Sequence, residues 1–160
     1  MVLWDRVFQS VAAEYPDIET ESLLVDAAAM NFIRRPASFD VVVGSNLFSD
    51  ILSDLSAAVI GSMGLAASAN LDPTRRFPSM FEPVHGSAPD IAGKDLANPT
   101  ALLQSAVLML HHIHEKATAE RVQTALEKVY AEGKVLTRDV GGTSGTTAFG
   151  DAVIGAMGTA

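Results

Sequence analysis

Residues 39–62, FDVVVGSNLFSDILSDLSAAVIGS, constrain the fold more than any other stretch of the sequence. The β-branched run that ends at Gly44 is typical of a strand buried on both faces, as in a parallel sheet. The residues after it predict a long apolar helix, which Ser45 or Asn46 would cap. A strand, a tight turn and a helix in direct succession indicate an α/β fold.

The other segments continue this alternation. Residues 21–26 have the pattern of a short strand, and apolar spacing predicts helices elsewhere. The sequence shows no internal repeat and no linker, so we expect residues 1–160 to form a single region. The predicted helices cover residues 2–13, 26–35, 99–116 and 118–133, and a last helix follows the glycine-rich segment 138–153.

Composition excludes several classes of function. With 160 residues and 48% hydrophobic content, the chain can bury one real core. Its formal net charge of −8 repels a phosphate backbone, so we expect no nucleic acid partner. The lack of cysteine excludes disulfides, thiolate metal sites and a cysteine nucleophile, and it fits a reducing compartment.

The sequence also argues against a membrane protein. No apolar run approaches the roughly 18 residues that a spanning helix needs. Residues 1–10 lack the basic start and small-residue cleavage site of a signal peptide. We therefore expect a cytoplasmic protein.

Residues 61–98 are irregular and contain four of the seven prolines. A connection of this length in a compact domain is usually functional when it is ordered, and Phe77, Met80 and Phe81 argue for order. The sequence has no G-x-G-x-x-G fingerprint, no phosphate-binding loop and no nucleophile elbow. A ligand is therefore expected in this segment, but not through those familiar motifs.

Asp50 and Asp54 stand one turn apart on the predicted helix, where like charges are unfavourable. Two carboxylates on one face offer a hard cation, Mg²⁺ or Mn²⁺, two anionic ligands and leave positions for substrate oxygens. The alternative is a solvated helix face or a capping aspartate. The residues alone leave both interpretations open.

A second candidate metal cluster lies near the end of the predicted helix 99–116. His111 and Glu115 are one turn apart, with His112 and His114 beside them. A cation-rich last turn is also what the helix dipole favours, and Lys116 follows directly. Because two ligands on one helix leave the rest of a metal sphere unnamed, we favour the dipole interpretation.

The segment FEPVHGSAPD, residues 81–90, has the composition of a ligand loop. Small residues at 86–88 allow close backbone approach, and His85 can stack or donate. Asp90 could accept hydrogen bonds from a ribose diol and would repel a 2′-phosphate, which favours NAD over NADP. The alternative is a loop shaped only by Pro83 and Pro89.

Three of these stretches carry a resemblance to a known family. FDVVVGSNLFSDILSDLSA, FPSMFEPVHGSAPDIAGKDLANPTA and GGTSGTTAFGDAV closely resemble the β-decarboxylating dehydrogenases, which include isopropylmalate, isocitrate, homoisocitrate and tartrate/D-malate dehydrogenases. The arginine-bearing residues before FPS look most like the tartrate/D-malate branch, with isopropylmalate dehydrogenases as the alternative. The resemblance implies the C-terminal part of an α/β, isopropylmalate dehydrogenase-like fold, with a mixed sheet flanked by helices.

The resemblance also implies a metal site and a homodimer. Asp50 and Asp54 match the family's ligands for Mn²⁺ or Mg²⁺, and Asp26 matches a third carboxylate that reaches the metal of the neighbouring subunit. Ser49 stands where the family usually has glycine, which could crowd the helix entry.

The same resemblance implies an NAD site in the second half of the chain. Asp90 and Ile91 correspond to the NAD-type pair, where NADP-using relatives carry lysine and tyrosine. Asn98 is expected at the adenine end, and Asp139 lies in a loop that nears the adenosine. The full set of implied NAD-binding residues is Glu82, His85, Gly86, Ser87, Ala88, Asp90, Ile91, Asn98 and Asp139.

The implied reaction is the metal-assisted, NAD-dependent oxidative decarboxylation of a small 2-hydroxy acid. The resemblance covers only the C-terminal half of the family and implies that the general base is a lysine located shortly before the segment that matches Met1. No lysine precedes Lys94 in this sequence, so none can be assigned that role. We therefore expect weak turnover or none from this chain alone. The alternatives are a 3-isopropylmalate dehydrogenase fragment, a non-catalytic NAD- and metal-binding or dimerisation fragment, and an acidic structural module without a ligand.

Overall fold

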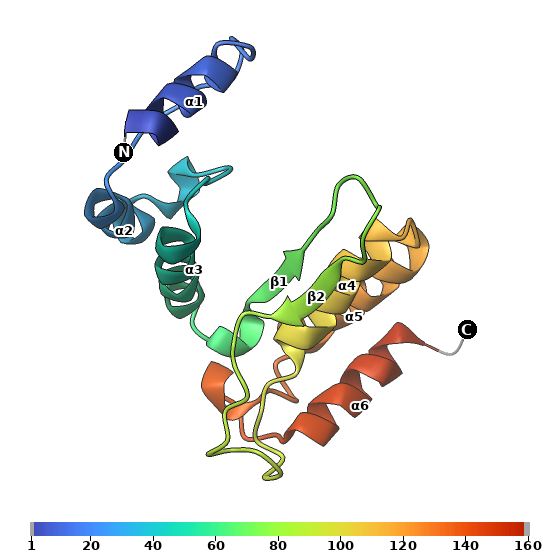
Figure 1. Ribbon diagram of the computed structural model, residues 1–160. Helices are drawn as coiled ribbons and strands as arrows, with labels where there is room; N and C mark the ends of the chain where they lie inside the picture. The colour runs from blue at the N-terminus through green and yellow to red at the C-terminus, as the bar shows by residue number, and fades with distance from the viewer. Residues whose placement is uncertain (1, 159–160) are drawn as a thin grey trace. The chain divides into compact units, whose positions relative to one another are not determined.

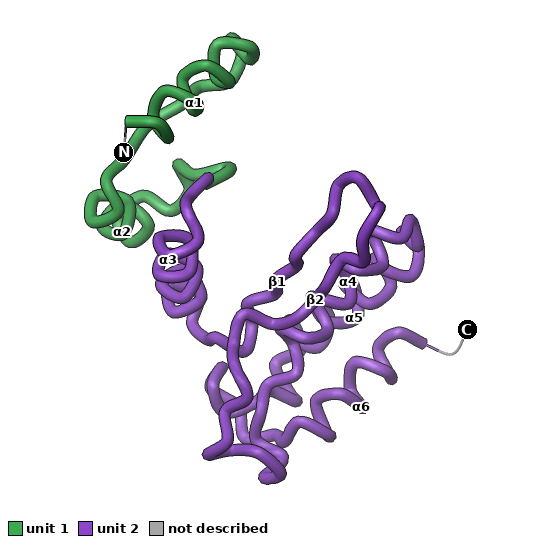
Figure 2. The backbone as a smooth tube through the Cα atoms, in the orientation of Figure 1, with its two compact units in different colours: residues 1–42 green, residues 43–160 purple. Residues whose placement is uncertain are grey.

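The computed structural model describes residues 2–158 and divides the chain into two compact units, residues 1–42 and residues 43–160 (Figure 2). In the first unit, helix α1 (Val2–Ala12) has no buried residue, and helix α2 (Val25–Arg34) buries Ala28 and Asn31. A short 3₁₀ helix, η1 (Pro36–Ser38), follows. The rings of Phe32 and Phe39 pack edge to face, 4.8 Å between centroids, and hold η1 against α2.

The second unit begins with helix α3 (Asn46–Val59), which starts after Ser45 as the sequence predicts. The Ser45 side chain forms no capping hydrogen bond. A 3₁₀ helix, η2 (Met63–Leu65), leads from α3 into the sheet.

Two short strands, β1 (Ala67–Asn70) and β2 (Met80–Pro83), form an antiparallel pair in which Ala67 lies opposite Pro83. The connection between them is ordered by Asp72, whose carboxylate accepts backbone hydrogen bonds from Thr74, Arg76 and Phe77.

Helix α4 (Thr100–His112) packs on both strands (Figure 1). Ser105 is buried at this contact, where its Oγ lies 2.8 Å from the Glu82 carbonyl oxygen and 3.4 Å from the Ser68 backbone nitrogen. The carbonyl of Glu82, one residue before β2 ends, is therefore fixed by α4.

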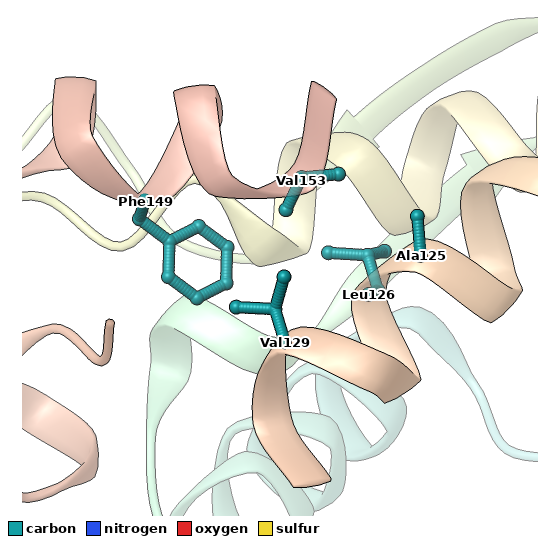
Figure 3. Close-up of a cluster of buried hydrophobic side chains, with 5 residues drawn as sticks. All are labelled: Ala125, Leu126, Val129, Phe149 and Val153. Carbon is teal, nitrogen blue, oxygen red and sulfur yellow. The ribbon is translucent and has the colours of Figure 1, made fainter. Parts of the chain in front are cut away.

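The core of the second unit lies where helix α5 (Lys116–Glu132) meets helix α6 (Thr146–Met157). Figure 3 shows α5 and α6 directing apolar side chains toward one another. The buried cluster consists of Ala125, Leu126, Val129, Phe149 and Val153. Gly133 ends α5 in the left-handed conformation, with φ of 65°, which glycine adopts without steric cost. A 3₁₀ helix, η3 (Arg138–Val140), lies between α5 and α6.

The predicted helices are confirmed within one or two residues at most ends, but the last helix begins at Thr146, inside the glycine-rich segment that was expected to be a loop up to residue 153. The predicted strands are wrong. Residues 21–24 and 39–45 belong to no strand. Val41 is 84% exposed and Val43 is 68% exposed, where a strand buried on both faces was expected. A parallel strand needs neighbours for its backbone groups, and within residues 2–158 the sheet consists of β1 and β2 alone, so it is antiparallel rather than mixed.

Candidate metal and dinucleotide site

Asp50 and Asp54 lie in the middle of α3 and are both exposed. Asn46 Nδ2 donates to Asp50 Oδ2 at 3.2 Å, and this neutral contact leaves the carboxylate charge uncompensated. Within the described residues, neither aspartate takes part in an ion pair. An uncompensated all-oxygen pair fits a hard divalent cation, since its charge would offset the repulsion between the two carboxylates.

Ser49 does not disturb the start of this helix. Its backbone nitrogen donates to the Ser45 carbonyl at 2.8 Å, as in a regular first turn. A side chain at Gly44 would come within 2.6 Å of Ser49 Oγ, so the hydroxyl fills the space that glycine leaves open. Asp50 therefore keeps its helical position despite the departure from the family's glycine.

Asp26 lies in the first turn of α2, in the other unit. It is exposed, and its Oδ1 accepts a hydrogen bond from the adjacent Ala27 nitrogen at 2.9 Å. Across residues 2–158, no three acidic or histidine side chains gather in a set that could hold a metal ion. Among the described residues, the chain thus offers a pair of candidate ligands on α3 rather than a complete metal sphere.

His112 and His114, near the end of α4, contact side chains of the loop between β1 and β2. His112 Nε2 lies 3.3 Å from Ser79 Oγ, and Arg75 Nη2 lies 3.1 Å from His114 Nε2. Arg75 also donates to the His112 carbonyl at 2.7 Å, where it meets the negative end of the helix dipole. These contacts fasten the loop to α4.

The predicted NAD loop leaves β2 directly after Pro83. His85 Nδ1 donates to the Gly86 carbonyl at 2.9 Å, which fixes the ring against the loop backbone. The space beside Gly86 is open, with no atom within 4 Å of a built Cβ position. Ala88 has φ of 42°, and the Ile91 nitrogen donates to its carbonyl at 3.0 Å.

The side chains of this loop are available to a ligand. Glu82, Gly86, Ser87, Ala88 and Asp90 are exposed, and His85 and Ile91 are partly exposed. Lys94 Nζ donates to the Asp90 carbonyl at 2.7 Å, so the turn is closed without using the Asp90 carboxylate. An exposed backbone with an unengaged carboxylate fits the diol-binding role predicted for Asp90.

Asn98 and Asp139, 41 positions apart in the sequence, are brought together at the start of α4. Asn98 Nδ2 donates to Asp139 Oδ2 at 3.0 Å and to the Tyr130 hydroxyl at 3.2 Å, and Asn98 Oδ1 accepts from the Thr100 nitrogen at 3.0 Å. Ser62 Oγ donates to the same Asp139 oxygen. Ser62 and Tyr130 were not predicted as site residues.

The hydrogen bonds keep Asp139 ionised. Burial alone would raise the pKa of Asp139, but hydrogen bonding, led by Ser62, outweighs it and holds the pKa below the usual carboxylate range. The Thr137 hydroxyl is fully buried and meets no partner at hydrogen-bonding geometry within the described residues. The side chains that donate hydrogen bonds to the Asp139 carboxylate are therefore those of Ser62 and Asn98. At neutral pH, Asp139 therefore offers a charged acceptor.

Asp95 links the loop after β2 to the glycine-rich segment, a connection that the sequence did not reveal. Its Oδ1 accepts from the backbone nitrogen and the hydroxyl of Thr147, both at 2.8 Å. A side chain at Gly145 would lie 2.1 Å from Asp95 Oδ2, so only glycine permits this approach. The partners lie 52 residues apart, and no local pattern signals such a contact.

Two open pockets lie elsewhere on the second unit. One, of about 300 Å³, is lined by α5 and α6, and the other, of about 360 Å³, lies between residues 75–81 and the end of α4. Neither is lined by a predicted metal or NAD residue.

Within residues 2–158, no helix has the length and apolar character needed to cross a membrane.

The fold is that of a family of decarboxylating dehydrogenases. The family model described as isocitrate/isopropylmalate dehydrogenase matches residues 1–153, and the chain belongs to this family. It is 51% identical over 153 residues to a probable tartrate dehydrogenase/decarboxylase of Bacillus subtilis, covering 96% of this chain and 43% of that protein. It is 52% identical over 151 residues to a 3-isopropylmalate dehydrogenase of Streptomyces griseus, covering 94% of this chain and 42% of that protein.

Solved structures confirm the predicted fold. The isocitrate dehydrogenase of Methylococcus capsulatus matches with a TM-score of 0.92 and 42% identity, over 98% of this chain and 46% of that one. The TT0538 protein of Thermus thermophilus matches with a TM-score of 0.91 and 46% identity, over 98% of this chain and 32% of that one. The chain thus spans less than half the length of these relatives.

Proposed function

We propose that this chain contributes to the NAD- and divalent-metal-dependent oxidative decarboxylation of a small 2-hydroxy acid of the tartrate/D-malate type. The observation that carries the proposal is the uncompensated pair Asp50 and Asp54 on the exposed face of α3, in a member of a dehydrogenase family. The residues of the loop after β2 and the Asn98–Asp139 pair support an adjoining site for the adenosine end of NAD.

In this proposal, the residues of the chain bind and orient rather than transfer protons. Asp50 and Asp54 hold Mn²⁺ or Mg²⁺, and Asp26 of a neighbouring subunit supplies a third carboxylate in a homodimer. When bound, the cation supplies Lewis-acid stabilisation of the negative charge that develops on substrate oxygens. Asp90 accepts from the ribose diol of NAD and disfavours a 2′-phosphate by like-charge repulsion.

Proton transfer is assigned to groups outside these 160 residues. A lysine base has no candidate here, because the first lysine of the sequence is Lys94, which donates to the Asp90 carbonyl. The chain also spans only 43% of the B. subtilis relative. We further propose a cytoplasmic location, which the cysteine-free composition supports.

The alternative substrate is 3-isopropylmalate, since a relative of that name is as similar as the tartrate dehydrogenases. The arginine-bearing residues 74–76 favour the tartrate/D-malate branch by their resemblance to it. The second alternative is a chain that binds NAD and metal without catalysis, which the coverage of less than half a relative supports.

Titration calorimetry with MnCl₂ tests the metal site directly. The unsubstituted chain is expected to bind Mn²⁺, and Asp50→Asn and Asp54→Asn are expected to lose most of that binding because each removes an anionic ligand. Asp151→Asn, which removes a charge from the exposed face of α6, is the matched control and should bind as the unsubstituted chain does. Equal binding by all four proteins would contradict the assignment of Asp50 and Asp54.

A further inference from the structure

The Asp139 carboxylate accepts its hydrogen bonds of standard geometry at one oxygen. Its Oδ2 accepts from Ser62 Oγ and from Asn98 Nδ2. Within residues 2–158, no hydrogen bond of standard geometry ends on Oδ1, and the residue is exposed. The carboxylate is thus fixed by the protein on one side and can accept from a ligand on the other.

The amide of Asn98 is already fully used by the protein. It donates both of its hydrogens, to Asp139 and Tyr130, and its oxygen caps α4 through the Thr100 nitrogen. Asn98 is only 7% exposed. A ligand can therefore meet the backbone of Asn98, whereas the side chain serves to hold Asp139.

Ser62 is the second support of Asp139, and it comes from a distant part of the chain. It lies 77 positions before Asp139, at the start of η2, and its Oγ also accepts from the Gly64 nitrogen at 2.9 Å. A hydroxyl can accept the one bond and donate the other at the same time. The side chain thus links the η2 turn to the carboxylate.

Gly64 indicates that the turn is shaped around this contact. A Cβ at this position would lie 2.8 Å from the Asn98 Cβ and 3.1 Å from Asp139 Oδ2. The backbone can approach the Asn98–Asp139 pair this closely only because Gly64 has no side chain. The close approach is independent of the hydrogen bonds and supports the same arrangement.

We propose that Ser62 is a positioning residue for the dinucleotide site: it fixes the Asp139 carboxylate so that Oδ1 remains the acceptor for a hydroxyl or amino donor of the adenosine end of NAD. This inference rests on the proposed function, which supplies the ligand. It assigns to Ser62 no contact with NAD itself. A tertiary link that served stability alone would not change how a folded chain binds NAD.

The test combines NAD titration calorimetry with an NMR titration of the Asp139 side-chain carboxyl carbon. Ser62→Ala is expected to weaken NAD binding about tenfold, the scale of one hydrogen bond to a charged group. It is also expected to raise the pKa of Asp139, because a donor to the charged form is lost. Ser62→Thr keeps the hydroxyl and should restore both properties.

Ser56→Ala is the matched control, because Ser56 donates to the Leu52 carbonyl within α3 and has no contact with Asp139. It should leave both readouts unchanged, and circular dichroism at the titration temperature verifies that each variant is folded. An unchanged NAD affinity, or an unchanged Asp139 pKa, in folded Ser62→Ala would overturn the positioning role.

The two proposals fail in distinguishable ways. If the unsubstituted chain binds no NAD, the dinucleotide part of the proposed function fails for this chain, and the positioning role is overturned with the ligand that it names. If the unsubstituted chain binds NAD and Ser62→Ala binds it equally, the proposed function stands and only the role of Ser62 is wrong.

Discussion

At the scale of single residues, the glycines of the C-terminal segment differ in whether the fold requires them. A Cβ at Gly142 would lie 1.9 Å from the Leu136 carbonyl oxygen, and the Gly142 nitrogen donates to the Thr137 carbonyl at 2.9 Å. The constraint is steric and comes from a backbone atom, which cannot rotate away as a side chain can. Gly150, in α6, has open space at its Cβ position.

This contrast gives a matched pair of substitutions. We expect Gly142→Ala to lower the free energy of unfolding by roughly 1–3 kcal/mol, the usual cost of forcing atoms into a packed site. Gly150→Ala should raise it by up to about 1 kcal/mol, because alanine is the better helix former. Urea unfolding followed by circular dichroism measures both, and a Gly142→Ala protein as stable as the unsubstituted chain would contradict the steric argument.

At the scale of elements, the contact between α5 and α6 is the main source of apolar burial. Leu126 is 1% exposed and packs in the cluster that contains Phe149. Leu126→Ala is expected to cost about 2–5 kcal/mol of unfolding free energy, through lost burial and the cavity that remains. Leu102→Ala, at a position 57% exposed on α4, should cost far less. Similar losses at both positions in urea unfolding would show that the α5–α6 cluster is not the stabilising core.

The start of α6 adds a pH-dependent contribution. The hydrogen bonds from the Thr147 backbone and hydroxyl lower the pKa of Asp95 in the folded chain, and a small opposing effect of burial does not reverse this. A lowered folded pKa stabilises the fold above the carboxyl's ordinary value near 3.9. The stabilisation is lost as the pH falls through the folded pKa, since both states are then protonated.

Asp95→Asn should therefore be less stable than the unsubstituted chain at pH 7, and the difference should shrink below about pH 4. Unfolding in urea at a series of pH values measures this difference. Asp151→Asn removes a charge from α6 and leaves both Thr147 hydrogen bonds to Asp95 in place, so it serves as the control for the loss of one carboxylate. A constant gap between Asp95→Asn and the unsubstituted chain across all pH values would contradict the linkage.

The elements also show what sequence alone can predict. Among the described residues, α1 to α5 were predicted because their apolar periodicity and end signals are local, whereas the start of α6 was placed too late because its first eight residues lie in a glycine-rich segment expected to be a loop. The hairpin of β1 and β2 was missed because each strand has only four residues and ASAN lacks β-branched residues. The strand predicted over residues 39–44 failed because pairing depends on neighbours that a local pattern cannot specify.

In the candidate site, too, only residues with nearby partners in the sequence could be singled out as candidates. The pair Asp50 and Asp54 and the loop 82–91 could be identified because their residues are close in sequence and resemble family motifs. Ser62 and Asp95 could not, since their partners lie 77 and 52 positions away. Only the fold brings such pairs together.

At the scale of the whole molecule, the chain exposes large apolar side chains and covers less than half the length of its relatives. Large apolar side chains are exposed on several elements, including Val41 and Val43 before α3 and Leu47 and Ile51 on it. Contiguous exposed apolar surface usually marks an interaction site. We therefore expect these side chains to contact other protein surface, as in the homodimer proposed above.

The partial coverage of its relatives leads to a prediction about the catalytic behaviour of the purified chain. With Mn²⁺, NAD and either D-malate or tartrate, NADH absorbance should stay at background, because the chain supplies carboxylates for a metal but has no lysine before Lys94 to act as base. Binding of Mn²⁺ in the same preparation shows that the protein is folded and that its ligands are intact. NADH formation that disappears in Asp50→Asn would contradict this expectation, since the proton-transfer group would then lie within these 160 residues.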